Sequence, residues 1–215
     1  MSIRKVEQQP ERERAPNAPH THGYLDSPAR DGGAERPLLL VDVDGVISLF
    51  GFDPDRCPNG HWQMVDGVAH FLSGTAGAHL RRLSAAYELA WCTGWEDKAN
   101  EYLPLALGFD RHLPHLSFAD AIPHVGGHWK LRAIDRYAGA DRPVAWIDDA
   151  HEERCRAWAQ ERSGPTLLIT TDPATGLTGE HVGRLLDWAS ALGRDHREDG
   201  RQSQSDGRPR RPSVA

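Results

Sequence analysis

Five short apolar runs alternate with amphipathic stretches through the middle of this chain, and this alternation is the feature that most constrains its fold. The runs lie at residues 38–43, 88–92, 115–119, 143–148 and 166–170. The stretches with helical character lie at residues 75–86, 96–107, 128–138, 151–160 and 178–191. Continuous apolar runs of this length are typical of strands that are buried on both faces of a parallel sheet. The alternation therefore predicts an α/β fold in three layers, with helices on both faces of the sheet.

The two ends of the chain are more polar than its middle. Residues 1–36 hold nine apolar residues among Glu, Arg, Pro and Gln, and residues 193–215 hold only Val214 and Ala215. Such segments have too little apolar surface to offset the entropy that ordering them would cost. We therefore expect disordered tails at 1–36 and 193–215 and one folded domain over residues 37–192.

The composition argues against several classes of protein. No stretch approaches the roughly 18 consecutive apolar residues of a transmembrane helix, and the N-terminus lacks the apolar segment of a signal peptide. Cys57, Cys92 and Cys155 are odd in number and lack metal-site spacing, which is typical of a reducing compartment. We expect a cytoplasmic protein that does not bind membranes.

The net charge bears on nucleic-acid binding. The chain carries 25 Lys and Arg against 31 Asp and Glu, a formal charge of −6. Residues 193–215 contain six Arg and four acidic residues, so the acidic excess belongs to the central domain. An acidic domain does not favour nucleic-acid binding over its whole surface, although it leaves a local site open.

Polar groups gather where the predicted strands end or the following helix begins. They are Asp42, Asp44, Thr93, Gly94, Lys130, Asp148 and Asp149. Ligands of parallel α/β sheets bind at the carboxyl ends of the strands, so we expect these groups to share one site. Carboxylates without His or Cys favour Mg²⁺, and a hydroxyl, backbone N–H groups and a lysine can hold a phosphoryl group. Carboxylates and phosphate repel unless a divalent cation lies between them, so the sequence predicts phosphoryl chemistry assisted by Mg²⁺.

Each of these residues also has a structural explanation. Asp42 and Asp44 precede Gly45, as turn residues often do, and Thr93 could serve as a helix N-cap. Lys130 alone would be read as a surface lysine. These residues form four motifs, namely Asp42 with Asp44, Thr93 with Gly94, Lys130, and Asp148 with Asp149. All four occur in order, each at a strand end or helix start, which favours the catalytic interpretation.

This order of motifs resembles the haloacid dehalogenase-like (HAD) superfamily. The sequence DVDGV at 42–46 is followed by Thr93 after an apolar strand, by Lys130 at a helix start and by the pair Asp148-Asp149 after another strand. The resemblance extends over residues 37–192. It implies a Rossmann-like fold and a phosphatase-type hydrolase that forms an aspartyl-phosphate with the help of Mg²⁺.

The resemblance implies roles for the two acids of the first motif. Asp42 would be the nucleophile and a metal ligand. Asp44 would protonate the leaving oxygen and then activate water, while its backbone carbonyl binds the metal. Dehalogenase and phosphonatase branches lack the second acid, so Asp44 favours phosphate ester hydrolysis.

The other motifs acquire roles in the same way. Thr93, the backbone N–H of Gly94 and the Lys130 ammonium would bind the phosphoryl oxygens. Asp148 and Asp149 would complete the metal site, and which of them binds the ion directly is left open.

The segment after the first motif is too short for a large cap domain. Residues 47–73 contain the hairpin signal Asp66-Gly67 between HWQMV and VAHFL, which predicts a small β-hairpin flap. A nearly capless member of this superfamily is expected to accept a bulky phosphorylated substrate or to receive a lid from a partner. Trp62, Trp95 and Trp129 lie in the flap or beside the motifs, where they either pack or line a pocket and stack on a base.

The sequence thus leaves three hypotheses about function. The first is a Mg²⁺-dependent phosphomonoesterase acting through an aspartyl-phosphate. The second is a narrower version, a nucleotide or nucleic-acid-end phosphatase, which the acidic domain does not favour. The third is a non-catalytic phosphate-binding or regulatory module with the same fold. The identity of the substrate and the oligomeric state are left open.

Overall fold

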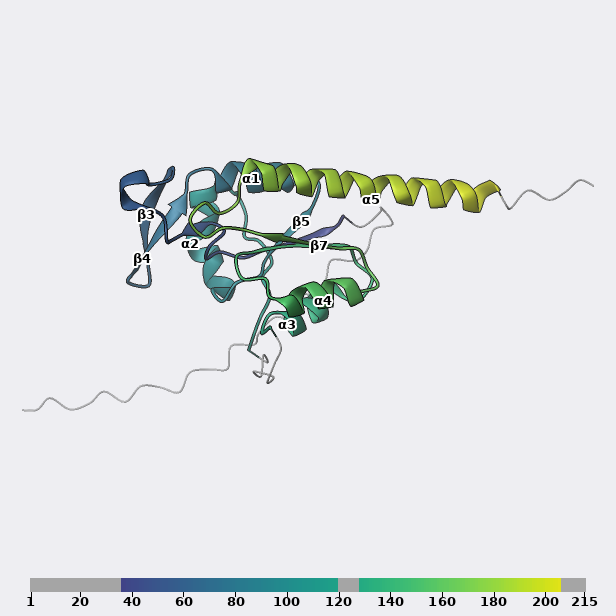
Figure 1. Ribbon diagram of the computed structural model, residues 1–215, viewed down its shortest axis with the longest axis horizontal. Helices are drawn as coiled ribbons and strands as arrows, with labels where there is room; N and C mark the ends of the chain where they lie inside the picture. The colour runs from purple at the N-terminus through teal and green to yellow at the C-terminus, as the bar shows by residue number, and fades with distance from the viewer. Residues whose placement is uncertain (1–35, 120–127, 206–215) are drawn as a thin grey trace, which may run out of the picture. The chain divides into compact units, whose positions relative to one another are not determined.

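The computed structural model of this 215-residue chain describes residues 36–119 and 128–205, and its side chains through residue 194 (Figure 1). A four-stranded parallel sheet has the order β5-β1-β6-β7. Its strands are β1 (Leu38–Val41), β5 (Glu88–Trp91), β6 (Val144–Asp148) and β7 (Thr166–Thr170). Strand β1 is central, and Val41 lies opposite both Trp91 and Ile147. The carboxyl ends of three strands therefore meet beside Asp42.

Helices cover both faces of the sheet, as the alternation of the sequence predicts (Figure 1). They are α1 (Ala76–Leu83), α2 (Ala99–Leu107), α3 (Leu131–Ala138), α4 (Glu153–Glu161) and α5 (Gly179–Ser205). Helices α1, α2 and α5 pack on one face and helices α3 and α4 on the other. The three-layer, Rossmann-like α/β architecture is confirmed.

Residues of β1 alternate between the two cores, which explains why the strand is apolar throughout. Leu39 and Val41 belong to the core beneath α1, α2 and α5. Leu38 and Leu40 belong to the core beneath α3 and α4. All four side chains are fully buried, because a sheet covered on both faces leaves no face for polar residues.

The prediction of a strand at 115–119 is wrong, because no strand forms there in the structure. Only an isolated parallel bridge joins His115 to Trp91, supported by the bond from the Leu116 N–H to the Trp91 carbonyl at 2.9 Å. Two residues further on, the Phe118 N–H donates to the Glu96 carboxylate at 2.9 Å. The chain leaves the sheet there because a side chain takes the place of the next strand partner.

The predicted β-hairpin flap is confirmed. Strand β3 (Gly60–Val65) pairs antiparallel with β4 (Val68–Ser73), and β4 also pairs with the short strand β2 (Ser48–Leu49). The turn residues Asp66 and Gly67 have φ values of 49° and 81°, the left-handed conformations that a two-residue type I′ turn requires.

Two short 3₁₀ helices lie in the flap segment and after the Thr93-Gly94 motif. They are η1 (Pro54–Arg56), which lies between β2 and β3, and η2 (Glu96–Lys98), which directly precedes α2. The flap turn is held to this region, since the Asp66 carboxylate accepts hydrogen bonds from Lys98 and from the Tyr102 hydroxyl. The segment between the first motif and α1 is therefore a flap and not a separate cap domain.

The limits of the folded domain stay a prediction. Helix α5 runs to Ser205 and so passes residue 192, where the composition predicts the end of the domain. Residues 1–35, nearly all of the predicted N-terminal tail, and residues 206–215, the last part of the predicted C-terminal tail, lie outside the described residues. Within the described residues, no helix combines the length and apolarity needed to cross a membrane.

Helix α2 offers a test of the core. Leu103 is fully buried, whereas Leu105 on the same helix is 91% exposed. We expect Leu103→Ala to lower the free energy of unfolding by about 2–5 kcal/mol, because it removes buried methyl groups and leaves a cavity. Leu105→Ala is the matched control and should change it by less than about 0.5 kcal/mol. Urea denaturation followed by circular dichroism measures both, and equal effects would contradict the assigned core.

Candidate active site

Asp42 is the first residue after the central strand, and its carboxylate is fixed by backbone and side-chain bonds. Its N–H donates to the Ile147 carbonyl at 3.0 Å, which continues the β1–β6 ladder. Its Oδ1 accepts the Val43 N–H at 2.8 Å. The residue is buried, with 7% of its surface exposed. A carboxylate in this position needs a cationic partner, since burying an unpaired charge is costly.

Lys130 supplies that partner and joins two strand ends. It directly precedes α3, and its Nζ lies 2.6 Å from Asp42 Oδ2 and 2.7 Å from Asp148 Oδ2. Only 3% of the lysine is exposed. The second oxygen of Asp148 accepts the Ala150 N–H at 2.9 Å, so this carboxylate is held on both sides. Lys130 is therefore a buried cation shared by two carboxylates and not a surface lysine.

Asp149 completes a group of three carboxylates. One oxygen from each of Asp42, Asp148 and Asp149 lies within 4.8 Å of the others. Gly45 makes room for this approach, because a side-chain carbon at that position would lie 2.4 Å from the Asp149 carboxyl carbon. Gly45 also has φ of 69°, which other residues adopt only with strain. The donor set consists of hard oxygens and fits Mg²⁺.

The electrostatics of the cluster also favour an added cation. Burial raises the pKa of Asp42 to about 7, with Lys130 opposing the rise and Asp148 adding to it. Burial raises the pKa of Asp149 as well, and Asp148 again contributes. Burial lowers the pKa of Lys130, but attraction to the carboxylates outweighs it and the net change is upward. One ammonium faces three carboxylates here, so a divalent cation would stabilise their ionised forms.

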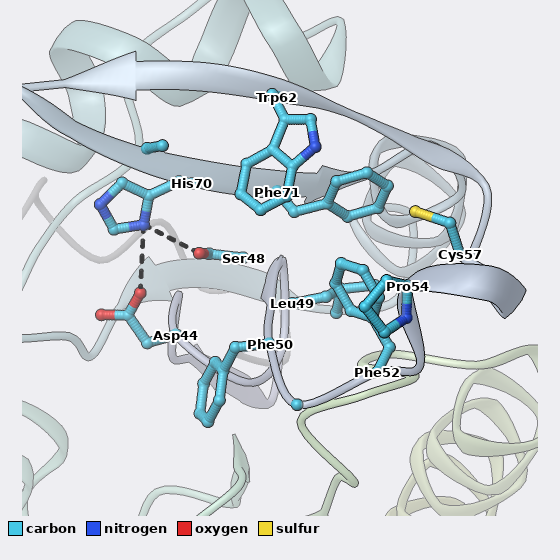
Figure 2. A pocket seen from close by; sticks show the side chains of 12 residues that line it. Asp44, Ser48, Leu49, Phe50, Phe52, Pro54, Cys57, Trp62, His70 and Phe71 are labelled. Atoms are coloured by element: carbon cyan, nitrogen blue, oxygen red, sulfur yellow. Dashed lines mark hydrogen bonds and ion pairs between the residues drawn. The ribbon is translucent and has the colours of Figure 1, made fainter.

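Asp44 is not one of these three carboxylates, although its charge helps to raise the pKa of Asp149, and its side chain contacts the flap. Its Oδ2 accepts a hydrogen bond from Trp95 Nε1 at 2.9 Å, and its Oδ1 lies 3.6 Å from His70 Nδ1 (Figure 2). The Ser48 hydroxyl is 2.9 Å from the same His70 nitrogen, and the His70 and Trp95 rings meet edge to face. Asp44 is half-exposed, so it can reach both a ligand and water. Its expected metal contact through the backbone carbonyl stays a prediction.

Thr93 and Gly94 lie at the end of β5, beside the end of β1. The two strand ends are joined by the bond from the Cys92 N–H to the Val41 carbonyl at 2.8 Å. Thr93 is buried, whereas Gly94 is exposed and a side-chain carbon there would lie 3.7 Å from Trp129. The structure thus brings both residues to the same edge of the sheet as Asp42, and their role in binding phosphate stays a prediction.

The three aromatic residues noted in the sequence have different positions. Trp95 contacts Asp44, as described above. Trp129 packs edge to face on Phe118 at 4.5 Å and lies 5.1 Å from the Lys130 Nζ. Trp62 lies on the flap strand β3 and is 64% exposed. Sequence reasoning missed His70, because a single histidine in a hairpin carries no motif.

A sequence profile of one family matches most of the folded chain. The family is described as the HAD domain in Swiss Army Knife RNA repair proteins, and the match covers residues 38–182. The chain belongs to this HAD family. This HAD domain is accordingly a HAD-like hydrolase, and the family match spans all of the motifs whose geometry is described above.

Two solved structures are similar to this HAD domain. One is a hypothetical protein from Xanthomonas campestris, at 16% identity and a TM-score of 0.39, with 74% of this chain and 88% of that chain covered. The other is a putative 3-deoxy-D-manno-octulosonate 8-phosphate phosphatase from Vibrio cholerae, at 20% identity and a TM-score of 0.37, with 72% and 83% covered. No curated protein sequence matches the chain.

The shared cation generates a prediction about stability. Lys130→Met leaves Asp42 and Asp148 buried without their ammonium, so we expect the free energy of unfolding to fall by about 3–5 kcal/mol in the presence of EDTA. Adding Asp42→Asn should recover part of the loss, because one of the two charges is then removed. Urea denaturation measures both effects.

Lys98→Met is the control for this prediction. Lys98 pairs with Asp66 in an exposed position, where ion pairs contribute little, so its loss should barely change stability. A Lys130→Met protein as stable as the Lys98→Met protein would contradict the role of Lys130.

Proposed function

We propose that this HAD domain is a Mg²⁺-dependent phosphomonoesterase that acts through an aspartyl-phosphate on Asp42. The observation that carries the proposal is the position of the Asp42 carboxylate, which ends the central strand beside one buried ammonium and two further carboxylates. A nucleophile, a charge-balancing lysine and a hard-oxygen cation site are thereby within reach of one phosphoryl group. Mg²⁺ held by Asp42, Asp148 and Asp149 would reduce the repulsion between the nucleophilic carboxylate and the phosphate.

The chain's own residues account for both half-reactions. A carboxylate oxygen of Asp42 forms a bond to phosphorus while the bond from phosphorus to the ester oxygen breaks, and Asp44 gives its proton to that oxygen. In the second half-reaction a water gives a proton to Asp44 and its oxygen attacks phosphorus, which releases phosphate and restores the Asp42 carboxylate. Thr93, Gly94 and Lys130 bind the phosphoryl oxygens in both steps.

The two acids have environments that suit these different tasks. Asp42 is buried and held by Lys130, whereas Asp44 is half-exposed and held by Trp95 and His70. Two carboxylates in unlike surroundings can serve as nucleophile and as general acid in the same site. This separation supports turnover over the non-catalytic phosphate-binding module, which would have no use for the second acid.

We propose a phosphorylated nucleotide or nucleic-acid end as the substrate class. The matching family is described by its occurrence in RNA repair proteins. The central domain carries an acidic excess, which disfavours binding along a nucleic-acid chain. Recognition would therefore concentrate on the end that carries the phosphate. The cytoplasmic location predicted from the sequence is compatible with such a substrate and stays a prediction.

Replacing the nucleophile tests the proposed mechanism. Asp42→Asn should lower kcat by at least about a thousandfold on an aryl phosphate with Mg²⁺, because the amide cannot form the phosphoenzyme. Excess EDTA should abolish wild-type turnover. Asp187→Asn, an exposed position on α5, is the control and should retain activity.

Two results would overturn the mechanism. One is activity that survives Asp42→Asn or the removal of metal. The other is wild-type protein that binds beryllofluoride with Mg²⁺ and turns over no phosphate ester, which would instead support a regulatory module.

Replacing Asp44 gives a test that depends on the leaving group. Asp44→Asn should lower kcat/KM for glycerol 2-phosphate by about 10²–10⁴-fold, since a poor leaving group needs a proton. The loss in kcat/KM for 4-nitrophenyl phosphate should be much smaller, and a burst of nitrophenol should precede slow turnover because the phosphoenzyme then lacks its general base. Equal losses for both substrates would contradict the assignment of Asp44 as general acid.

A further inference from the structure

An aromatic pocket lies beside Asp44, between the flap and the loop that follows β2 (Figure 2). Its volume is about 600 Å³, within the range of small-molecule sites. Phe52, Trp62 and Phe71 form its apolar wall, with ring centroids 4.8 Å apart for Phe52 and Phe71 and 5.2 Å apart for Trp62 and Phe71. Phe50 also lines the pocket and is 49% exposed.

This pocket adjoins the candidate active site at Asp44, which lines it. Asp44, Ser48 and His70 line one side of it, and Figure 2 shows one His70 ring nitrogen joined to both the Asp44 carboxylate and the Ser48 hydroxyl. Asp44 is the group that protonates the leaving oxygen in the proposed reaction. The part of the substrate attached to that oxygen must therefore lie next to the pocket.

The charge of the lining limits what the pocket can hold. Among the described residues that line it there is no Lys or Arg, and Asp44 is the one carboxylate. A second phosphate placed inside the pocket would find no cation there to balance its charge. The lining instead fits an uncharged, planar and largely apolar group.

The exposure of Trp62 gives further support. Phe71 is 4% exposed and packs within the flap, whereas Trp62 keeps 64% of its surface in contact with solvent. An indole that packs on Phe71 yet keeps most of its surface open at the pocket is suited to stacking on a ligand ring.

We propose that this pocket binds the nucleobase of the nucleoside that carries the scissile phosphate, with Trp62 stacking on the base. The inference rests on the proposed phosphatase function and narrows its substrate class to nucleoside monophosphates and phosphorylated nucleic-acid ends. Stacking tolerates any base because every base has a π face, so the pocket selects for a nucleoside and not for a sequence.

Binding without chemistry provides the first test. Asp42→Asn protein is mixed with adenosine or with ribose, and saturation-transfer NMR detects contact with the base protons. We expect transfer to adenosine but not to ribose, and its loss in the Asp42→Asn/Trp62→Ala double variant. Adenosine that receives no saturation, or receives it equally after Trp62→Ala, would overturn the inference. This readout is independent of turnover and of Mg²⁺.

Kinetics provide the second test. We compare kcat/KM for 3′-AMP and 5′-AMP with kcat/KM for glycerol 2-phosphate, which has no ring. Trp62→Ala should lower the nucleotide-to-glycerol ratio about tenfold, and Trp62→Phe should restore most of it. Met64→Ala is the matched control, since Met64 is 60% exposed on the same strand and lies outside the pocket lining. Oligonucleotides with the same terminal phosphates distinguish a nucleic-acid end from a free nucleotide.

The possible outcomes separate the two proposals. A wild-type protein that hydrolyses none of these esters contradicts the proposed function, whereas an active protein whose ratio is unchanged by Trp62→Ala contradicts only the pocket assignment. Sedimentation velocity tests whether a second copy of the chain occupies the pocket instead. A concentration-dependent dimer that Trp62→Ala abolishes, together with a lack of nucleoside binding, would overturn the inference and make the aromatic surface an interface between copies.

Discussion

The charge balance around Lys130 is the interaction on which the site depends. Asp42 and Asp148 come from adjacent strands, and parallel strands that end at the same level bring their carboxylates close together whatever the charge. The buried ammonium makes this tolerable, but it does not neutralise Asp149 as well. The fold therefore holds an excess of negative charge at the edge of its sheet. That excess is unfavourable for stability alone and useful for holding a cation against a phosphoryl group.

The flap gives the second acid a different environment. Asp44 is only two residues from Asp42, yet its side chain contacts His70 of the hairpin and Trp95 beyond β5 instead of the carboxylate cluster. The hairpin can reach it because β4, which carries His70, pairs with β2, and β2 begins four residues after Asp44. One short insertion thus both positions Asp44, the proposed general acid, and builds an aromatic wall near it. A separate cap domain is not needed for either purpose.

Much of the fold and part of the site could be predicted from local patterns. The buried strands could be predicted because a sheet covered on both faces requires continuous apolar runs. The hairpin could be predicted because type I′ turns favour Asp-Gly. The strand predicted at 115–119 failed for a nonlocal reason: Glu96, far away in sequence, accepts the Phe118 N–H and diverts the chain from the sheet. His70 could not have been found, since its role comes from the pairing of β4 with β2, which carries Ser48.

The sequence by itself determined the class of fold, the order of the four motifs and the residue types at the strand ends. These depend on the period of the apolar residues and on short turn signals, which are local properties of the chain. Only the tertiary structure decided that Lys130 bridges Asp42 and Asp148, that Gly45 admits Asp149 and that Asp44 faces the flap. Those contacts join residues at least 18 positions apart. They follow from how strands and helices pack, which no local pattern specifies.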